Sequence, residues 1–212
     1  MRFLVSLLLV LQLSACSEPE QPTISLYLAV QRGDINQIER HIHWKSDLNQ
    51  LDPDGNYPLQ VVAKRGKIIE VELLLKHGAE VNAVDPAGQT AVGDALLAGR
   101  IRVVDLLLKH GAKLDADALL LKAAREGNND RDVISYLVRK GANIEARDEQ
   151  GDTPLLIAIH LGNHRLVRHL INQGADVNTK GANGQSALAL ALELKSMDIA
   201  SLLQQQGALV GQ

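Results

Sequence analysis

The sequence predicts an all-α repeat solenoid of about six units, each a pair of helices joined to the next unit by a short β-hairpin loop. A Gly-Ala dipeptide recurs with its glycine at positions 78, 111, 141, 174 and 207, at spacings of 33, 30, 33 and 33 residues. Two further glycine series run in phase with it, at positions 33, 66, 99, 127 and 162 and at positions 55, 88, 151 and 184. Glycine favours tight turns and helix ends, so these series indicate three chain reversals per unit.

An apolar stripe precedes each Gly-Ala pair. Apolar residues recur seven, four and three positions before the glycine, as with Ile134, Leu137 and Val138. This i, i+3, i+4 spacing predicts one buried face on the second helix of each unit. The polar exceptions, His41 and Gln204, fall in the first and last units, where a repeat has a neighbour on one side only.

The repeat phase divides residues 24–208 into units. We expect a signal peptide over residues 1–15, a lipidated cysteine and tether over 16–23, and a short tail over 209–212. The six units span residues 24–51, 52–84, 85–115, 116–147, 148–178 and 179–208.

The clearest unit, Asp148–Asn178, has the sequence DEQGDTPLLIAIHLGNHRLVRHLINQGADVN. Thr153 is placed to cap its first helix, and Pro154 suits the first helical position because no backbone N–H is needed there. This unit resembles the ankyrin repeat. Weaker forms of its start stand at 56–59 (NYPL), 89–92 (QTAV) and 185–188 (QSAL), and an asparagine four residues after the closing position recurs at 49, 82 and 178. The resemblance covers about Ile24–Ala208 and implies helix pairs with hairpin loops.

The chain departs from the ankyrin pattern in several places. The histidine that usually follows Thr-Pro-Leu is replaced by Gln60, Gly93, Leu156 and Ala189, which puts its bracing hydrogen bonds between units in doubt. Lys45 stands in place of the closing glycine of unit one, and Lys195 in place of the mid-unit glycine of unit six.

The fourth unit lacks five residues of its hairpin, and the segment Asn128–Asp132 carries two extra residues. We therefore predict a notch in the row of hairpin fingers between units three and four, beside an enlarged turn between the helices. Structural drift and adaptation to a partner explain this departure equally well.

The first residues form a leader. Arg2 precedes the apolar run Phe3–Leu13, which is too short to span a membrane and suits the core of a secretory signal. The following Leu13-Ser14-Ala15-Cys16 resembles a bacterial lipobox. The resemblance implies a diacylglyceryl group on Cys16, cleavage before it, and acylation such as palmitoylation of the new amino terminus. The alternatives are an ordinary cleavable signal with an incidental cysteine, or a buried helix.

The expected location is the bacterial cell envelope. Ser17, rather than aspartate, follows Cys16, which by resemblance favours the outer membrane, facing the periplasm. Residues 17–23 (SEPEQPT) are polar and predict a short, semi-extended tether.

Composition argues against a nucleic-acid partner. The net charge of the 212 residues is −3, and only five side chains are Phe, Trp or Tyr. A phosphate backbone needs a basic excess and stacked bases need aromatic platforms. We expect a monomer.

Candidate chemistry is sparse. His160 and His164 have i, i+4 spacing, but Gly162 breaks the helix between them. No HExxH, GxSxG or GxxxxGK[ST] motif is present, and the pairs Asp52/Asp54 and Asp115/Asp117 suit turns better than acid–base catalysis. The sequence therefore predicts no enzyme, no cofactor and no metal site.

A stack of such units offers one continuous concave side, made of the fingers and the first helices. The candidate partner-binding residues on it are Arg32, Asp54, Asn56, Lys64, Arg65, Gln89, Leu97, Arg125, Glu149, Asp152 and His160. Arg32, Lys64 and Arg65 form the strongest candidate patch, which would suit an acidic partner surface.

The leading hypothesis is a lipid-anchored, non-enzymatic module that binds a protein partner in the envelope. By resemblance, such a protein can act as an immunity partner that inhibits a toxin or effector, or can accompany periplasmic defence against peroxide. An architectural scaffold of an envelope assembly is a third possibility. An enzyme or small-ligand protein would need a deep pocket lined by convergent polar groups.

Overall fold

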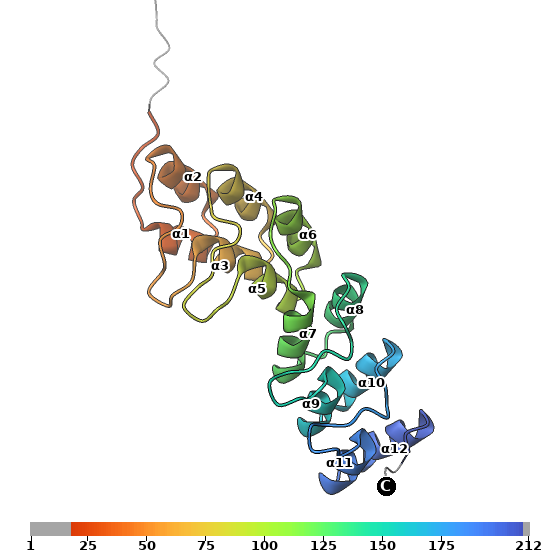
Figure 1. The fold of residues 1–212 in the computed structure, drawn as a ribbon. Coiled ribbons are helices and arrows are strands. Elements are labelled where there is room, and N and C mark those ends of the chain that lie inside the picture. The colour runs from red at the N-terminus through yellow and green to blue at the C-terminus, as the bar shows by residue number, and fades with distance from the viewer. Residues whose placement is uncertain (1–17, 210–212) are drawn as a thin grey trace, which may run out of the picture.

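A computed structural model describes residues 18–209, which contain twelve helices arranged as six antiparallel pairs (Figure 1). The pairs are α1 (Leu26–Arg32) with α2 (Ile35–His43), α3 (Pro58–Lys64) with α4 (Ile68–Lys76), α5 (Ala91–Leu97) with α6 (Ile101–Lys109), α7 (Ala116–Arg125) with α8 (Arg131–Arg139), α9 (Pro154–His160) with α10 (His164–Asn172), and α11 (Ala187–Glu193) with α12 (Met197–Gln205). The odd-numbered helices form an inner layer next to the fingers and the even-numbered helices form an outer layer. The prediction of an all-helical repeat solenoid is confirmed.

The first helix of unit five, α9, begins and ends where the sequence predicts. Thr153 Oγ1 accepts a hydrogen bond of 3.4 Å from the Leu156 N–H, and Pro154 occupies the first position of α9. Gly162 then adopts φ +62°, a left-handed conformation that ends the helix between His160 and His164.

The core lies between the two helical layers. Ile134 and Leu137 of the predicted stripe are fully buried. His41 is also buried, and its ring satisfies both nitrogens: Nε2 donates to the Ile24 carbonyl at 2.8 Å and Nδ1 accepts from Ser46 Oγ at 2.9 Å. A polar residue in the stripe of the end unit is therefore tolerated because it is fully hydrogen-bonded.

The notch between units three and four is confirmed. Turns at residues 52–55, 85–88, 148–151 and 181–184 form four fingers, and two carry an antiparallel bridge, Val84 with Thr90 and Lys180 with Ser186. Between α6 and α7 the chain passes directly from Lys109 to Ala116 without a finger, and α7 has 10 residues where the other inner helices have 7. The missing finger is thus replaced by an additional stretch of helix.

The enlarged turn is also present. Five residues separate α7 from α8, whereas two or three separate the helices of every other pair within residues 18–209. Figure 1 shows that the stack changes direction at α7. Across this junction the Tyr136 hydroxyl of α8 donates a 2.7 Å hydrogen bond to Asp105 Oδ1 of α6, and Asn128 Nδ2 donates to the Leu97 carbonyl at 2.8 Å.

The asparagines at the ends of the units link neighbouring units. Asn49 Nδ2 donates to the Gly78 carbonyl at 3.3 Å, and Asn49 Oδ1 accepts from the Glu80 N–H at 2.8 Å. Asn82 makes the same pair of contacts one unit later, with the Gly111 carbonyl and the Lys113 N–H. Each asparagine side chain therefore hydrogen-bonds to the backbone of the next unit, about thirty residues away.

Gln60 supplies bracing at the position of the missing histidine. Its Oε1 accepts from the Tyr57 N–H at 2.8 Å, which caps α3, and its Nε2 donates to Asp85 Oδ2 at 3.1 Å and to the Gln89 carbonyl at 3.0 Å. The doubt about bracing is thus removed for this unit, because glutamine can both accept and donate.

Both lysines that replace glycines adopt the left-handed conformation that the glycines would have taken. Lys45 has φ +54° and Lys195 has φ +56°. They are the non-glycine residues with positive φ in the described part of the chain, so the repeat imposes the turn even where the residue disfavours it.

Candidate protein-binding surface

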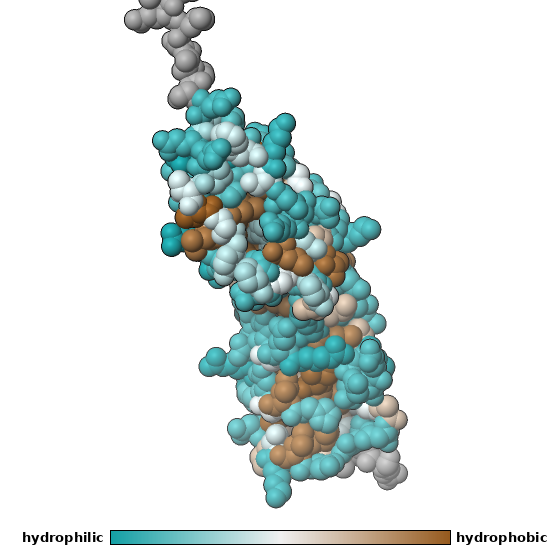
Figure 2. All heavy atoms as spheres, turned by 90° about the vertical axis from the view of Figure 1, so that its left-hand side faces the viewer, coloured by the Kyte–Doolittle hydropathy of each residue, from teal (hydrophilic) through white to brown (hydrophobic). Residues whose placement is uncertain are grey.

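The inner helices and the fingers form one face of the solenoid, which Figure 2 shows. Most of the predicted binding residues are exposed or half-buried on it. Polar side chains cover most of this face, and apolar side chains gather in two areas, over the N-terminal units and down the C-terminal units.

The predicted basic patch of Arg32, Lys64 and Arg65 lies at the C-terminal ends of α1 and α3, and all three side chains are exposed. The Arg65 guanidinium, however, donates to the Gln31 carbonyl and, at 2.6 Å, to Gln31 Oε1. Arg65 therefore braces units one and two. Arg32 and Lys64 form no ion pair within residues 18–209, which leaves two cations available to a partner.

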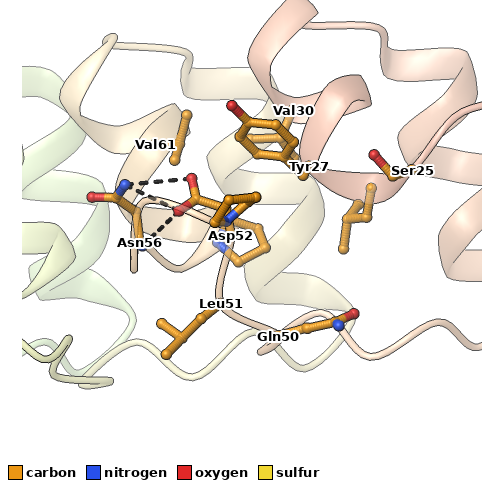
Figure 3. Close-up of a pocket in the computed structure, with 11 residues that line it drawn as sticks. Ser25, Tyr27, Val30, Gln50, Leu51, Asp52, Asn56 and Val61 are labelled. Carbon is orange, nitrogen blue, oxygen red and sulfur yellow. Dashed lines mark hydrogen bonds between the residues drawn. The ribbon is translucent and has the colours of Figure 1, made fainter.

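A recess of about 390 Å³ opens beside this patch, between α1, the first finger and α3 (Figure 3). Its walls are largely apolar: Leu26, Tyr27 and Leu51 contribute, together with Val61. Two of its polar side chains are already paired, because Asn56 donates from its N–H and its Nδ2 to the carboxylate of Asp52. The recess suits an apolar side chain of a partner, and it was not predictable from the sequence because its walls come from separate units.

Three of the four fingers owe their shape to an aspartate at their start, and the fourth starts at Gly181. Asp52 Oδ1 accepts from the Asp54 N–H at 2.9 Å, Asp85 Oδ1 from the Gln89 N–H at 2.7 Å, and Asp148 Oδ1 from the Asp152 N–H at 2.9 Å. The Asp52 carboxylate is thus confirmed as a turn residue.

The tips of the fingers remain free for contact. Asp54 and Glu149 are exposed, whereas Asn56, Gln89 and Asp152 are half-buried at the finger bases.

Asp115 and Asp117 take structural roles too. Asp115 Oδ1 caps α7 by accepting from the Ala118 N–H at 3.0 Å, and Asp117 Oδ1 accepts from the Asn143 N–H at 2.6 Å.

Two of the binding residues predicted in units four and five lie within ion-pair distance of carboxylates in the fingers. Arg125 Nη2 lies 3.3 Å from Asp148 Oδ2, and His160 Nε2 lies 3.5 Å from Asp152 Oδ2. Leu97 is half-buried against the core rather than free. The structure therefore gives a free basic pair at the N-terminal end, whereas beyond the notch Arg125 and His160 are paired internally and Glu149 stays exposed.

Asp94, on α5, is a further candidate, which was not among the residues predicted from the sequence. It occupies the position five residues before the mid-unit glycine, where other units place Val61 and Ile157. Burial raises the pKa of the Asp94 carboxyl, and the nearby cations Lys64 and Lys122 partly oppose this. A carboxylate at a position that is apolar in most units, with Lys122 at the same position of unit four, was the signal that could have found it.

The described residues contain neither a cluster of three metal-binding side chains nor a helix long and apolar enough to cross a bilayer. Cys16, the expected lipidation site, lies outside the described residues.

Comparisons with known proteins agree with this architecture. A family model described as "Ankyrin repeats (3 copies)" matches residues 26–118 and 120–212. No curated protein matches. Among solved structures, the ankyrin repeat domain of Bcl-3, a member of the IkappaB protein family, is 26% identical with a TM-score of 0.71, covering 89% of this chain and 88% of that chain. The human ASB11 ankyrin repeat domain is 25% identical with a TM-score of 0.71, covering 89% and 86%.

A bacterial structure is similarly close. It is the complex of the predatory endopeptidase Bd0816 from Bdellovibrio bacteriovorus with immunity protein Bd3460. One of its chains is 27% identical to this one with a TM-score of 0.69, covering 88% of this chain and 100% of that chain.

Proposed function

The chain belongs to the ankyrin-repeat family, whose repeats are protein–protein interaction modules, and from this premise we propose that it is an immunity or inhibitor protein anchored in the bacterial envelope. It holds a protein partner, such as a toxin or a lytic enzyme, on the face of the inner helices and fingers. The lipid on Cys16 keeps it close to the membrane where that partner acts.

The observation that carries this proposal is the free basic pair Arg32 and Lys64 beside the apolar recess. An interface needs a buried apolar anchor and complementary charge around it, and these two features supply both. The partner surface should then present an apolar side chain next to carboxylates.

The similarity to a chain from the endopeptidase–immunity protein complex supports inhibition over recruitment. A rigid, preformed surface is sufficient to block an enzyme, because binding alone then covers its active site. The bracing of units one and two by Arg65 favours such rigidity at the proposed contact.

The test is a crosslinking pull-down from native membranes with the full chain. We expect one dominant partner whose activity falls in proportion to bound protein, and whose capture drops about tenfold or more when Arg32→Glu and Lys64→Glu are combined. The matched control reverses two exposed lysines at the ends of outer helices, Lys76→Glu and Lys109→Glu, and should capture the partner normally.

Two results would contradict the proposal. Equal capture by both double variants would remove the basic pair from the interface. A captured enzyme that stays fully active, for instance a catalase, would favour the alternative role in peroxide defence.

A further inference from the structure

Residues 19–24, which lead into the solenoid, are bonded to α2 rather than free of it. The Trp44 indole Nε1 donates to the Pro19 carbonyl at 3.2 Å, and Arg40 forms a 3.0 Å ion pair with Glu20. Arg40 also donates to the Gln21 carbonyl at 3.4 Å.

Two buried side chains of α2 hold the end of the same segment. Gln37 Oε1 accepts from the Thr23 N–H at 2.9 Å, and His41 Nε2 donates to the Ile24 carbonyl at 2.8 Å. The bonds to Pro19, Glu20, Gln21, Thr23 and Ile24 follow one another along the chain, so the segment is fixed over most of its length.

This fixation shortens the reach of an anchor on Cys16. Three peptide steps separate Cys16 from Pro19, which at about 3.6 Å each span at most about 11 Å. Eight steps would separate Cys16 from Ile24 if the segment were free, which would allow about 29 Å. A lipid on Cys16 therefore holds the first unit close to the headgroups.

The end of α2 presents side chains suited to that position. Trp44 follows α2 with 41% of its surface exposed, and His43 and Lys45 on either side of it are exposed as well. Tryptophan is favoured at membrane interfaces because its large ring is apolar while its N–H is polar, and lysine beside it suits the headgroup layer.

We propose that the Trp44 end of the first unit rests on the lipid surface to which Cys16 is anchored, with the remaining units extending away from it. This inference rests on the proposed lipid anchoring. The occupant is a lipid surface because the docked segment leads toward the anchor and its Pro19 carbonyl is bonded to the Trp44 indole. Figure 1 shows the N-terminal segment and the C-terminal end at opposite ends of the stack, so unit six lies farthest from the bilayer.

The arrangement leaves the binding face beside the membrane rather than under it. The inner helices and fingers are then accessible from the aqueous side, while the first unit is fixed. A partner that acts at the membrane surface would meet the basic pair of units one and two first.

Trp44 is the only tryptophan of the chain, which provides a direct assay. The full-length lipidated protein is reconstituted in vesicles of phosphatidylethanolamine and phosphatidylglycerol, with or without bromine on the acyl chains near the glycerol. We expect brominated lipid to lower Trp44 fluorescence about twofold. In a second protein, Trp44→Phe is combined with Met197→Trp, which moves the reporter to an exposed site on α12, and its fluorescence should not change.

The docked segment is tested with Arg40→Ala, which removes the ion pair and one hydrogen bond, against Arg102→Ala, an exposed arginine of α6. Arg40→Ala should lose most of the quenching while its circular dichroism stays that of the parent, and Arg102→Ala should keep it.

The outcomes separate this inference from the proposed anchoring. A chain without lipid on Cys16, shown by the mass of its amino-terminal peptide, overturns both. A lipidated chain whose Trp44 is not quenched overturns the orientation alone, as does equal quenching of reporters at 44 and 197. Shielding of Trp44 that requires an added protein would instead identify this end as a protein contact.

Discussion

Removing one hydroxyl at the notch should weaken the link between the two halves of the solenoid. Tyr136 of α8 is 4% exposed, and its hydroxyl donates at 2.7 Å to Asp105 Oδ1 of α6. Because no finger joins units three and four, this bond is one of the few polar links at the outer side of the junction. Tyr136→Phe deletes the bond and keeps the buried ring.

A hydrogen bond to a charged group contributes about 1.5–3 kcal/mol, and a neutral one about 1 kcal/mol. The Asp105 carboxylate is exposed and regains water when the hydroxyl is lost, so the lower part of that range applies. We expect Tyr136→Phe to lower the free energy of unfolding by about 1–2 kcal/mol. Asp105→Asn keeps an acceptor and should cost about half as much.

The assay is urea unfolding followed by two signals. Circular dichroism reports the whole stack, whereas Trp44 fluorescence reports the first unit. In the parent the two midpoints should coincide. In Tyr136→Phe they should separate, because each unit contacts only its neighbours and the weakened junction lets the halves unfold apart.

The pH dependence provides a second check. Burial, together with the hydrogen bond to Asp105, raises the pKa of the Tyr136 hydroxyl above its ordinary value of 10.0. The folded state therefore holds this proton more tightly, so the stabilisation is complete below pH 10 and declines as the pH rises above it. The difference in free energy of unfolding between the parent and Tyr136→Phe should therefore shrink above pH 10. A difference below about 0.3 kcal/mol at pH 7 would refute the reasoning.

Three further predictions concern stability. Thr179→Val should raise the free energy of unfolding by about 1 kcal/mol, because Oγ1 of Thr179 is buried without a hydrogen-bond partner. A lower melting temperature of the variant in thermal denaturation would mean that a water molecule or a backbone group hydrogen-bonds the hydroxyl. Lys195→Gly should stabilise by about 0.5–1 kcal/mol, since glycine adopts φ +56° without strain, while Lys195→Ala should give no gain; equal effects of the two would contradict a backbone origin. Asp94→Asn should stabilise at pH 7 and be neutral near pH 3, because the raised pKa of Asp94 means that the parent loses stability as the pH rises above the ordinary value of 3.8; a gain that does not vary with pH would exclude ionisation as the cause.

The backbone of this protein was predictable from its sequence because the rules of the repeat are local. Counting residues between Gly111 and Ala123 was enough to predict the missing finger, and an excess of two residues after Gly127 predicted the enlarged turn. Glycine positions and apolar spacing act within one unit, so no knowledge of distant contacts was required.

The surface was less predictable because its side chains bond across units. Arg65 was predicted to be a free cation, yet it donates hydrogen bonds to Gln31. Gln60 links neighbouring units through a hydrogen bond to Asp85, which its residue type alone did not indicate. The N-terminal segment was expected to be a tether, and its bonds to α2 depend on Arg40 and Trp44, more than fifteen residues later in the chain. Such pairings require the three-dimensional neighbours of each residue.

The missing finger also makes residues 112–115 the natural insertion point of this chain. Repeats contact only adjacent repeats, so a hairpin added between Ala112 and Asp115 would alter one junction and leave the stacking of the other units unchanged. A peptide tag or a labelled loop grafted there would project beside the bend of the molecule. The position thus suits sensors that report the angle between the first three and the last three repeats.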